Sequence, residues 1–125
     1  EIKSTKGGGA AAVSKAFKEI DKGGLKTQNR TEILGKLVGA AYCAQAEAGG
    51  AVFTICEYAE AAQAEKGKPK RAAMFGEKNA EHVNRTMVLS IAPTDDEKQI
   101  RAAKKIADLF NAIGNPAAKQ PKDPK

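Results

Sequence analysis

The sequence predicts an all-α protein, an up-and-down bundle of four to five helices. Alanine makes up about a fifth of the chain, tryptophan is absent and aromatic residues are only 5% of the total, a composition that favours close-packed helices over a sheet of β-branched side chains. Apolar residues recur at helical spacing between glycines and prolines. Cys43 and Cys56 also lie six residues before Gly49 and six residues after Gly50, which predicts two antiparallel helices around a turn.

The 125 residues are enough for one domain with a single core. We expect a flexible basic arm at 1–9, the helical bundle at 10–114 and an extended or disordered tail rich in lysine and proline at 115–125. The longest apolar stretch, 87–92, is far shorter than the ~20 residues of a membrane span. Because the chain begins at Glu1 without methionine or a leader, we expect a processed or a trimmed chain.

The first two helices are predicted from periodicity and end signals. The first helix covers residues 10–22 and ends at Gly23 and Gly24. A capping box of Asn29 and Glu32 opens the second helix, which runs to Gly49. The apolar stripes of the two helices are Val13, Ala16, Phe17 and Ile20 in the first, and Ile33, Leu34, Leu37, Val38, Ala41 and Ala44 in the second.

A return helix over 52–66, ending at Gly67, follows the Gly-Gly turn, although residues 52–55 alone also fit a strand. In an antiparallel hairpin Cys43 lies opposite Cys56, where a Cα separation of roughly 4.4–6.8 Å allows a disulfide. Two buried thiols in a reducing compartment are the alternative. Asn29 and Asn84 each begin an Asn-Arg-Thr glycosylation sequon, a short pattern that also arises by chance.

The second half of the chain predicts two further helices. Residues 66–71 read as a basic linker, and one helical turn is expected at 72–75. A fourth helix is predicted from Asn79 to a stop before Pro93. The last helix begins with a capping box of Thr94 and Glu97, supported by Asp95 and Asp96, and ends at Gly114. Its apolar half comprises Ile100, Ala103, Ile106, Ala107, Leu109, Phe110 and Ile113.

Charge is distributed unevenly along this basic protein, whose formal net charge is +6. Residues 1–26 have six basic and three acidic side chains, residues 27–65 have two and five, and residues 66–125 have thirteen and seven. The two basic ends predict electrostatic docking on an acidic protein assembly, with nucleic acid and an anionic membrane surface as other candidate partners. The candidate partner-binding residues are Lys66, Lys68, Lys70, Arg71, Lys98, Arg101, Lys104 and Lys105.

No catalytic, cofactor or metal motif is evident, so we expect a protein that is not an enzyme and needs no cofactor or metal. His82 is the single histidine, which removes multi-histidine metal sites. The glycines at 7–9 lack the Gly-Lys-Ser/Thr ending of a phosphate loop. Glu57 and Glu60 share a predicted helical face, but no second helix supplies matching carboxylates. A Cys43–His82 nucleophile pair has no third group to orient it.

The sequence therefore predicts a structural or accessory subunit of the extrinsic type that acts through protein–protein interaction. A disulfide and a processed start predict an exported, periplasmic or organelle-lumen compartment. The alternative is a packaging or coat protein that binds the phosphate backbone of nucleic acid without sequence specificity. Aromatic residues interleaved with basic ones, which stack on bases, are absent from the sequence.

Overall fold

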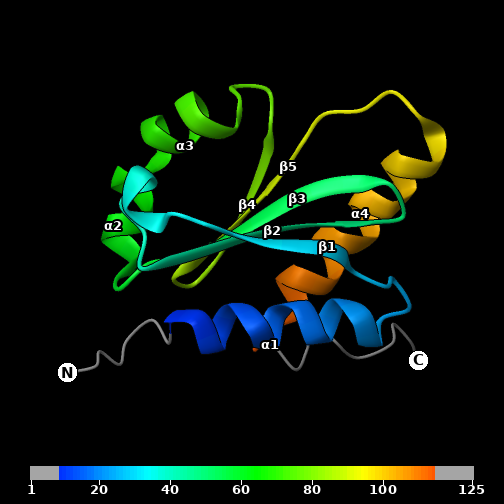
Figure 1. Cartoon of the computed structure of the whole chain (residues 1–125), viewed down its shortest axis with the longest axis horizontal. Coiled ribbons are helices and arrows are strands. Elements are labelled where there is room, and N and C mark those ends of the chain that lie inside the picture. Colours follow the sequence, from blue (N-terminus) through cyan, green and yellow to red (C-terminus); the bar gives the residue numbers. More distant parts are fainter. Residues whose placement is uncertain (1–8, 115–125) are drawn as a thin grey trace, which may run out of the picture.

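The chain folds into a five-stranded antiparallel sheet with helices on both faces (Figure 1), and the computed structural model describes residues 9–114. The strands are β1 (Gln28–Ile33), β2 (Tyr42–Ala48), β3 (Ala51–Glu57), β4 (Ala80–Asn84) and β5 (Met87–Ile91), in the order β1-β2-β3-β5-β4. The helices are α1 (Gly9–Lys22), the 3₁₀ turn η1 (Gly35–Val38), α2 (Ala61–Lys66), α3 (Lys68–Phe75) and α4 (Glu97–Ala112).

The predicted all-α helical bundle is therefore wrong, because the fold is a mixed α/β structure built on an antiparallel sheet. The predicted tail at 115–125 and all but the last residue of the predicted arm at 1–9 lie outside the described residues; Gly9 begins α1. None of the helices among residues 9–114 has the length and apolar character needed to cross a membrane.

The predicted helical hairpin around Gly49 and Gly50 is a β-hairpin, formed by β2 and β3. Both glycines have positive φ angles, 60° and 86°, as a two-residue type I′ turn between strands requires. In β2, alanine alternates with polar residues, so one side of the strand is apolar even though each alanine also favours a helix. This alternation favours a strand over a helix, because only in a strand do all the alanines lie on one face that the core can bury. The buried alanines are Ala44, Ala46 and Ala48.

α1 and α4 pack on the same face of the sheet and against each other, and the predictions of these two helices are confirmed. The main core lies between them and the sheet, where the rings of Phe17 and Phe53 are 5.6 Å apart. The cap of α4 differs from the prediction, since Asp96 rather than Thr94 accepts hydrogen bonds from the backbone N–H groups of the first turn. Ile100, predicted to lie in the core, is exposed.

The opposite face of the sheet is covered at one end by η1, α2 and α3 (Figure 1). The predicted second helix is replaced by β1, η1 and β2, and most of the predicted linker at 66–71 is the first turn of α3. The predicted fourth helix is the β4–β5 hairpin, which turns at Arg85 and Thr86. A second, smaller core fills this side, formed by Val38, Cys43, Cys56, Tyr58, Ala64 and Val88.

Cys43 and Cys56 form a disulfide inside this second core, with their Cα atoms 4.1 Å apart. The prediction of the bridge is confirmed, but its setting is two paired strands rather than two helices. The same symmetry about Gly49 and Gly50 places these residues opposite each other in either kind of hairpin. The bridge is consistent with folding in an oxidising compartment outside the cytoplasm.

Candidate functional site

β4 forms one edge of the sheet, and its backbone offers an open pairing surface. Asn84 pairs with Met87 next to the turn, so the alternation of the antiparallel ladder directs the backbone groups of residues 80, 82 and 84 toward β5. The N–H and C=O groups of Glu81 and Val83 then point away from the sheet. Within residues 9–114 these four groups have no backbone partner. The β4 edge is therefore free to pair with another strand.

The opposite edge, β1, does not offer such a surface. Its pairing with β2 is interrupted between Gln28 and Thr31, and Asn29 has a positive φ of 56°. The next residue, Arg30, places its guanidinium 4.5 Å from the ring centre of Phe17 and donates a hydrogen bond to Ser14. Bulges and charged side chains are common means of blocking a sheet edge. The regular edge of the sheet is thus β4.

A cavity of about 400 Å³ lies beside β4 on the side of α4. It is a mostly apolar groove, with Ile91 and Ala107 among its walls and Lys78, Lys104 and Asp108 around it. We call it the α4 groove. The remaining lining residues are Ala80, His82, Ala92, Pro93, Thr94, Ile100, Ala103 and Asn111.

A second cavity, of about 330 Å³, lies on the other face of β4, against α2 and α3. We call it the α3 hollow. Lys68 and Arg85 line it together with Glu65, and Val83 of β4 is 59% exposed beside them. The other lining residues are Ala61, Ala64, Arg71 and Glu81. A strand paired to β4 would direct alternate side chains to the α4 groove and the α3 hollow, because successive side chains of a strand point to opposite faces.

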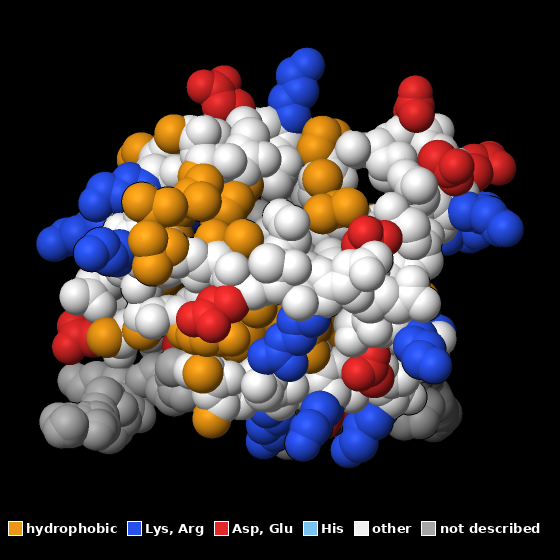
Figure 2. All heavy atoms as spheres, in the orientation of Figure 1, with side chains coloured by type: hydrophobic (Ala, Val, Ile, Leu, Met, Phe, Trp, Pro, Cys, Tyr) orange, Lys and Arg blue, Asp and Glu red, His pale blue; other side chains and the backbone are white. Residues whose placement is uncertain are grey.

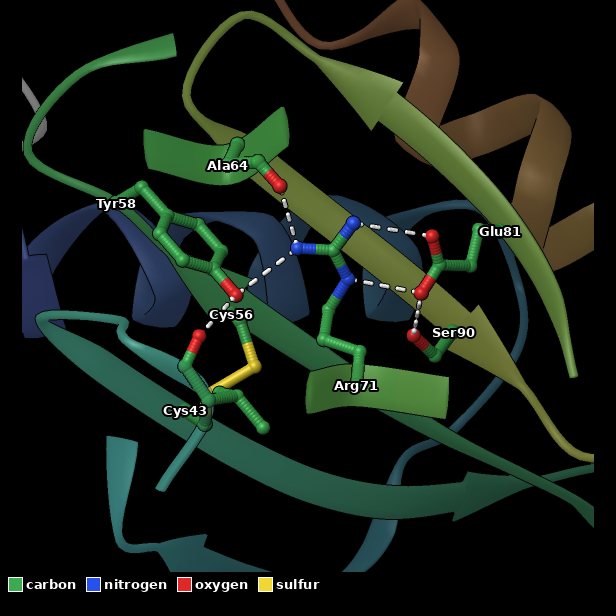
Figure 3. A network of polar contacts seen from close by, with 8 residues as sticks. Cys43, Cys56, Tyr58, Ala64, Arg71, Glu81 and Ser90 are labelled. Atoms are coloured by element: carbon green, nitrogen blue, oxygen red, sulfur yellow. Dashed lines mark hydrogen bonds and ion pairs between the residues drawn. A yellow bond between two sulfur atoms is a disulfide. The ribbon is translucent and has the colours of Figure 1, made fainter. Parts of the chain in front are cut away.

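Arg71 lines the α3 hollow and is held in place by a network of hydrogen bonds, which Figure 3 shows. Its Nε and Nη2 donate to the two carboxylate oxygens of Glu81 on β4, at 2.8 and 3.1 Å, and its Nη1 donates to the Tyr58 hydroxyl and to the Ala64 carbonyl. The Tyr58 hydroxyl in turn donates to the carbonyl of Val38, at 2.9 Å. These bonds tie η1, α2 and α3 to the edge strand.

The same contacts shift two pKa values. Burial raises the pKa of Tyr58, and the hydrogen bond from Arg71 opposes part of that rise. Burial acts to lower the pKa of Arg71, but the hydrogen bonds to Glu81 and Tyr58 outweigh it and raise the pKa above its usual value. Gly67 completes the arrangement, since a Cβ atom there would lie 2.6 Å from the Tyr58 hydroxyl oxygen.

The structure places the predicted partner-binding residues on two sides of the sheet. Arg71 is buried and holds the fold together, so it is not part of an exposed surface. Lys68 lines the α3 hollow and Lys104 lines the α4 groove, so the two lysines lie beside β4 on opposite faces of the sheet. The others are exposed away from the two cavities beside β4: Lys66 and Lys70 next to η1, and Lys98, Arg101 and Lys105 on α4.

The predicted basic residues therefore do not form one continuous basic face. Figure 2 shows Lys and Arg side chains along the lower rim, where α1 runs, and beside the η1 end, where hydrophobic side chains also gather. The exposed apolar residues at that end include Leu34 and Leu37, which the helical pattern had placed in the core. Within residues 9–114, the strand β4 is flanked on one face by Lys68 of α3 and on the other by Lys104 of α4.

The residues considered for catalysis remain apart. Cys43 is in the disulfide, so it cannot act as a nucleophile with His82. His82 lines the α4 groove, and Glu57 points into the core on the other side of the sheet from Cys56. Among the described residues, no group of three or more His, Cys, Asp or Glu side chains is arranged to hold a metal ion.

Sequence reasoning missed the edge strand itself. The available signal was the segment Met87–Ile91, which contains the β-branched residues Val88 and Ile91 and is separated from Val83 by the polar residues 84–86. No known protein family matches the sequence, and neither a curated protein nor a solved structure gives a significant match to the chain. The site must therefore be interpreted from its own geometry.

Proposed function

We propose that the protein is a non-enzymatic accessory subunit that docks on a larger assembly by pairing β4 with an extended, acidic segment of a partner protein. The observation that carries the proposal is the open β4 edge between two cavities lined by basic residues. Addition of a strand to an exposed edge is a common mode of peptide recognition, in which backbone hydrogen bonds provide affinity and side-chain pockets provide specificity.

The two cavities favour a partner segment in which apolar and acidic residues alternate. Side chains directed to the α4 groove meet apolar walls such as Ile91, with Lys78 and Lys104 at its border. Side chains directed to the α3 hollow meet Lys68 and Arg85. Glu81 does not oppose an acidic side chain strongly there, because both of its carboxylate oxygens are bonded to Arg71.

An acidic protein segment fits this edge better than nucleic acid or a membrane. An apolar groove would make no favourable contact with the phosphate backbone. Phe17, Phe53 and Phe110 are buried, and the partly buried Phe75 packs against the second core, so the described phenylalanines offer no stacking platform. The chain has no tryptophan, which is enriched where proteins contact the membrane interface. We place the subunit in an exported, periplasmic or organelle-lumen compartment, in agreement with the disulfide.

The direct test is binding of a fluorescent peptide in which aspartate and valine alternate, followed by anisotropy at low salt. Val83→Pro removes an N–H group that points away from the sheet, and proline is tolerated at such edge positions. We expect this variant to stay folded, as judged by circular dichroism, and to bind at least about tenfold more weakly. Val83→Thr, which keeps the N–H group, is the matched control and should bind like the wild type.

A second pair of variants tests the role of charge. Lys68→Glu changes a residue of the α3 hollow, which receives the acidic side chains, whereas Lys70→Glu makes the same change two residues further along α3, outside that hollow. We expect only the first to weaken peptide binding. Equal effects of the two, unchanged binding by Val83→Pro, or binding of duplex DNA or phosphatidylserine vesicles in place of the peptide would each contradict the proposal.

A further inference from the structure

Two leucines at η1 are exposed to solvent, outside the α4 groove and the α3 hollow. Leu34, which directly precedes η1, is 59% exposed, and Leu37 within it is 52% exposed. Figure 2 shows hydrophobic side chains gathered at this end of the molecule, with Lys and Arg side chains beside them. Exposed apolar side chains that lie together with a polar rim are typical of interaction sites.

The geometry of η1 explains why these leucines face solvent. In a 3₁₀ turn, side chains three residues apart lie above one another. Gly35 and Val38 have this spacing, and both are buried. Leu34 and Leu37 have the same spacing on an exposed side, and the N–H of Leu37 donates to the carbonyl of Leu34. The turn therefore presents two leucines together, side by side.

The turn is fixed by contacts on its buried side. A Cβ atom on Gly35 would lie 2.8 Å from the carbonyl oxygen of Ala40, so the backbone packs closely there. The Tyr58 hydroxyl donates to the carbonyl of Val38 at 2.9 Å. Gly39 ends the turn with a positive φ of 74°. Because these contacts hold the turn, the leucines cannot rotate into the core, and burying them requires another surface.

A cavity of about 170 Å³ with a basic lining lies beside the turn, between η1, α2 and α3. Lys66 of α2 and Lys70 of α3 line it, and both are exposed. Within residues 9–114 neither lysine forms an ion pair. The other lining residues are Val38, Gly39, Gln63 and Gly67, so none of the six is acidic. The cavity therefore suits a small anionic group.

We propose that this end of the protein binds the surface of an anionic phospholipid bilayer. Leu34 and Leu37 insert below the headgroups, and a lipid phosphate lies at the cavity of Lys66 and Lys70. A phospholipid carries an anionic group directly next to apolar chains, which matches the basic cavity beside the leucines. Lysines combined with exposed leucines are typical of surfaces that lie in the membrane interface, so tryptophan is not required.

An acidic protein surface is the alternative with the same charge, and the shape of the site favours the bilayer. Leu34 and Leu37 project from a turn and line none of the three cavities beside β4 and η1. A stable protein interface buries about 800 Å² on each partner. A bilayer contact requires only a few inserted apolar side chains with cations nearby. This membrane contact does not depend on peptide binding at β4.

Because the chain has no tryptophan, one introduced tryptophan reports insertion directly. The test adds vesicles of phosphatidylcholine, alone or mixed with phosphatidylserine, to the full chain carrying Leu37→Trp. We expect a blue shift of the emission with the mixed vesicles at low salt, and its loss at high salt. Val52→Trp is the control and should show no shift, since Val52 lies beside the Gly-Gly turn, at the opposite end of β3 from η1.

Substitutions at the leucines and lysines test the two parts of the contact by vesicle sedimentation. Leu37→Gln should weaken binding to the mixed vesicles about tenfold, whereas Val52→Gln should not change it. Lys70→Glu should also weaken binding at least about tenfold. Lys68→Glu, in the α3 hollow, should leave vesicle binding unchanged. Circular dichroism checks that each variant is folded.

Several outcomes would overturn the membrane proposal: no binding to the mixed vesicles, equal binding to pure phosphatidylcholine, unchanged binding by Leu37→Gln, or an equal shift in Val52→Trp. Displacement of the vesicles by the aspartate–valine peptide would point to an acidic protein partner at η1 instead. We expect vesicles and peptide to bind together. The variants separate the two proposals, because Lys68→Glu should weaken only peptide binding and Lys70→Glu only vesicle binding.

Discussion

Arg71 is the residue on which the attachment of α3 to the edge strand depends. Arg71→Met would leave the Glu81 carboxylate without its bidentate partner and the Ala64 carbonyl without a donor. We expect the free energy of unfolding to fall by about 3 kcal/mol, the usual result of removing one member of a buried ion pair. Urea denaturation of the wild type and the variant measures this loss. Glu81→Leu added to Arg71→Met should cost less than the two single changes together, and strict additivity would argue against a coupled pair.

Glu57 makes stability depend on pH in an unusual direction. Its pKa rises from the ordinary 4.5 to about 7 in the folded chain, mainly through burial, so the folded state keeps a proton that the unfolded state has lost. Stability should therefore fall as pH rises from about 4.5 to about 7, by at most about 3 kcal/mol, and then level off. Urea denaturation at pH 5 and pH 8 measures the effect. Glu57→Gln should remove this component, whereas Glu32→Gln, at an exposed position of β1, should leave it unchanged.

At the scale of elements, Asn84 links the β4–β5 hairpin to α4. Its side-chain N–H₂ group donates to the carbonyls of Phe110 and Ile113, at 2.7 and 2.9 Å, where the helix ends. Asn84→Asp replaces these donors by a carboxylate near the negative end of the helix, and we expect a loss of about 1–2 kcal/mol in thermal denaturation. Asn111→Asp, exposed in the last turn of α4, adds the same charge without removing a cap and should cost much less.

The elements also differ in how far the sequence predicts them. α1 and α4 are correctly predicted because each keeps a helical period over several turns and has a stop signal after it. β2 is wrongly predicted because its alanines favour a helix, although their alternation with Cys43, Gln45 and Glu47 fits a strand. In β4 and β5 the segments are too short for periodicity to distinguish the two structures. Whether these segments form helices or strands is decided by their burial against α1 and α4, which is a non-local effect.

At the scale of the whole molecule, the disulfide joins two strands in the centre of the sheet order. It closes a short loop, and in the chain-entropy account its removal costs about 3 kcal/mol. We expect the double change Cys43→Ala and Cys56→Ala to lower the urea midpoint by a corresponding amount, with the Gly-Gly turn still fixing the register. A reductant should lower the midpoint of the wild type but not that of the double variant, and a wild type insensitive to reductant would count against the stabilising role.

The candidate site is also a property of the whole molecule, which is why the sequence did not predict it. Lys68 and Lys104 are far apart in the chain, and they flank one strand only because β5 pairs with β3 and leaves β4 at the edge. No local pattern encodes that order of strands. The sequence did indicate the basic character of the regions around β4, but it assigned Arg71, a buried residue of the fold, to the same surface.

The difference between the two sheet edges limits how copies of this chain assemble with each other. If two molecules pair through β4, a twofold axis relates them and each regular edge is consumed by the other. The outer edges of that pair are then two copies of β1, each interrupted by its bulge and by Arg30. The part of the chain that the structure describes then offers no second regular edge, so growth of the sheet by edge pairing stops at a dimer.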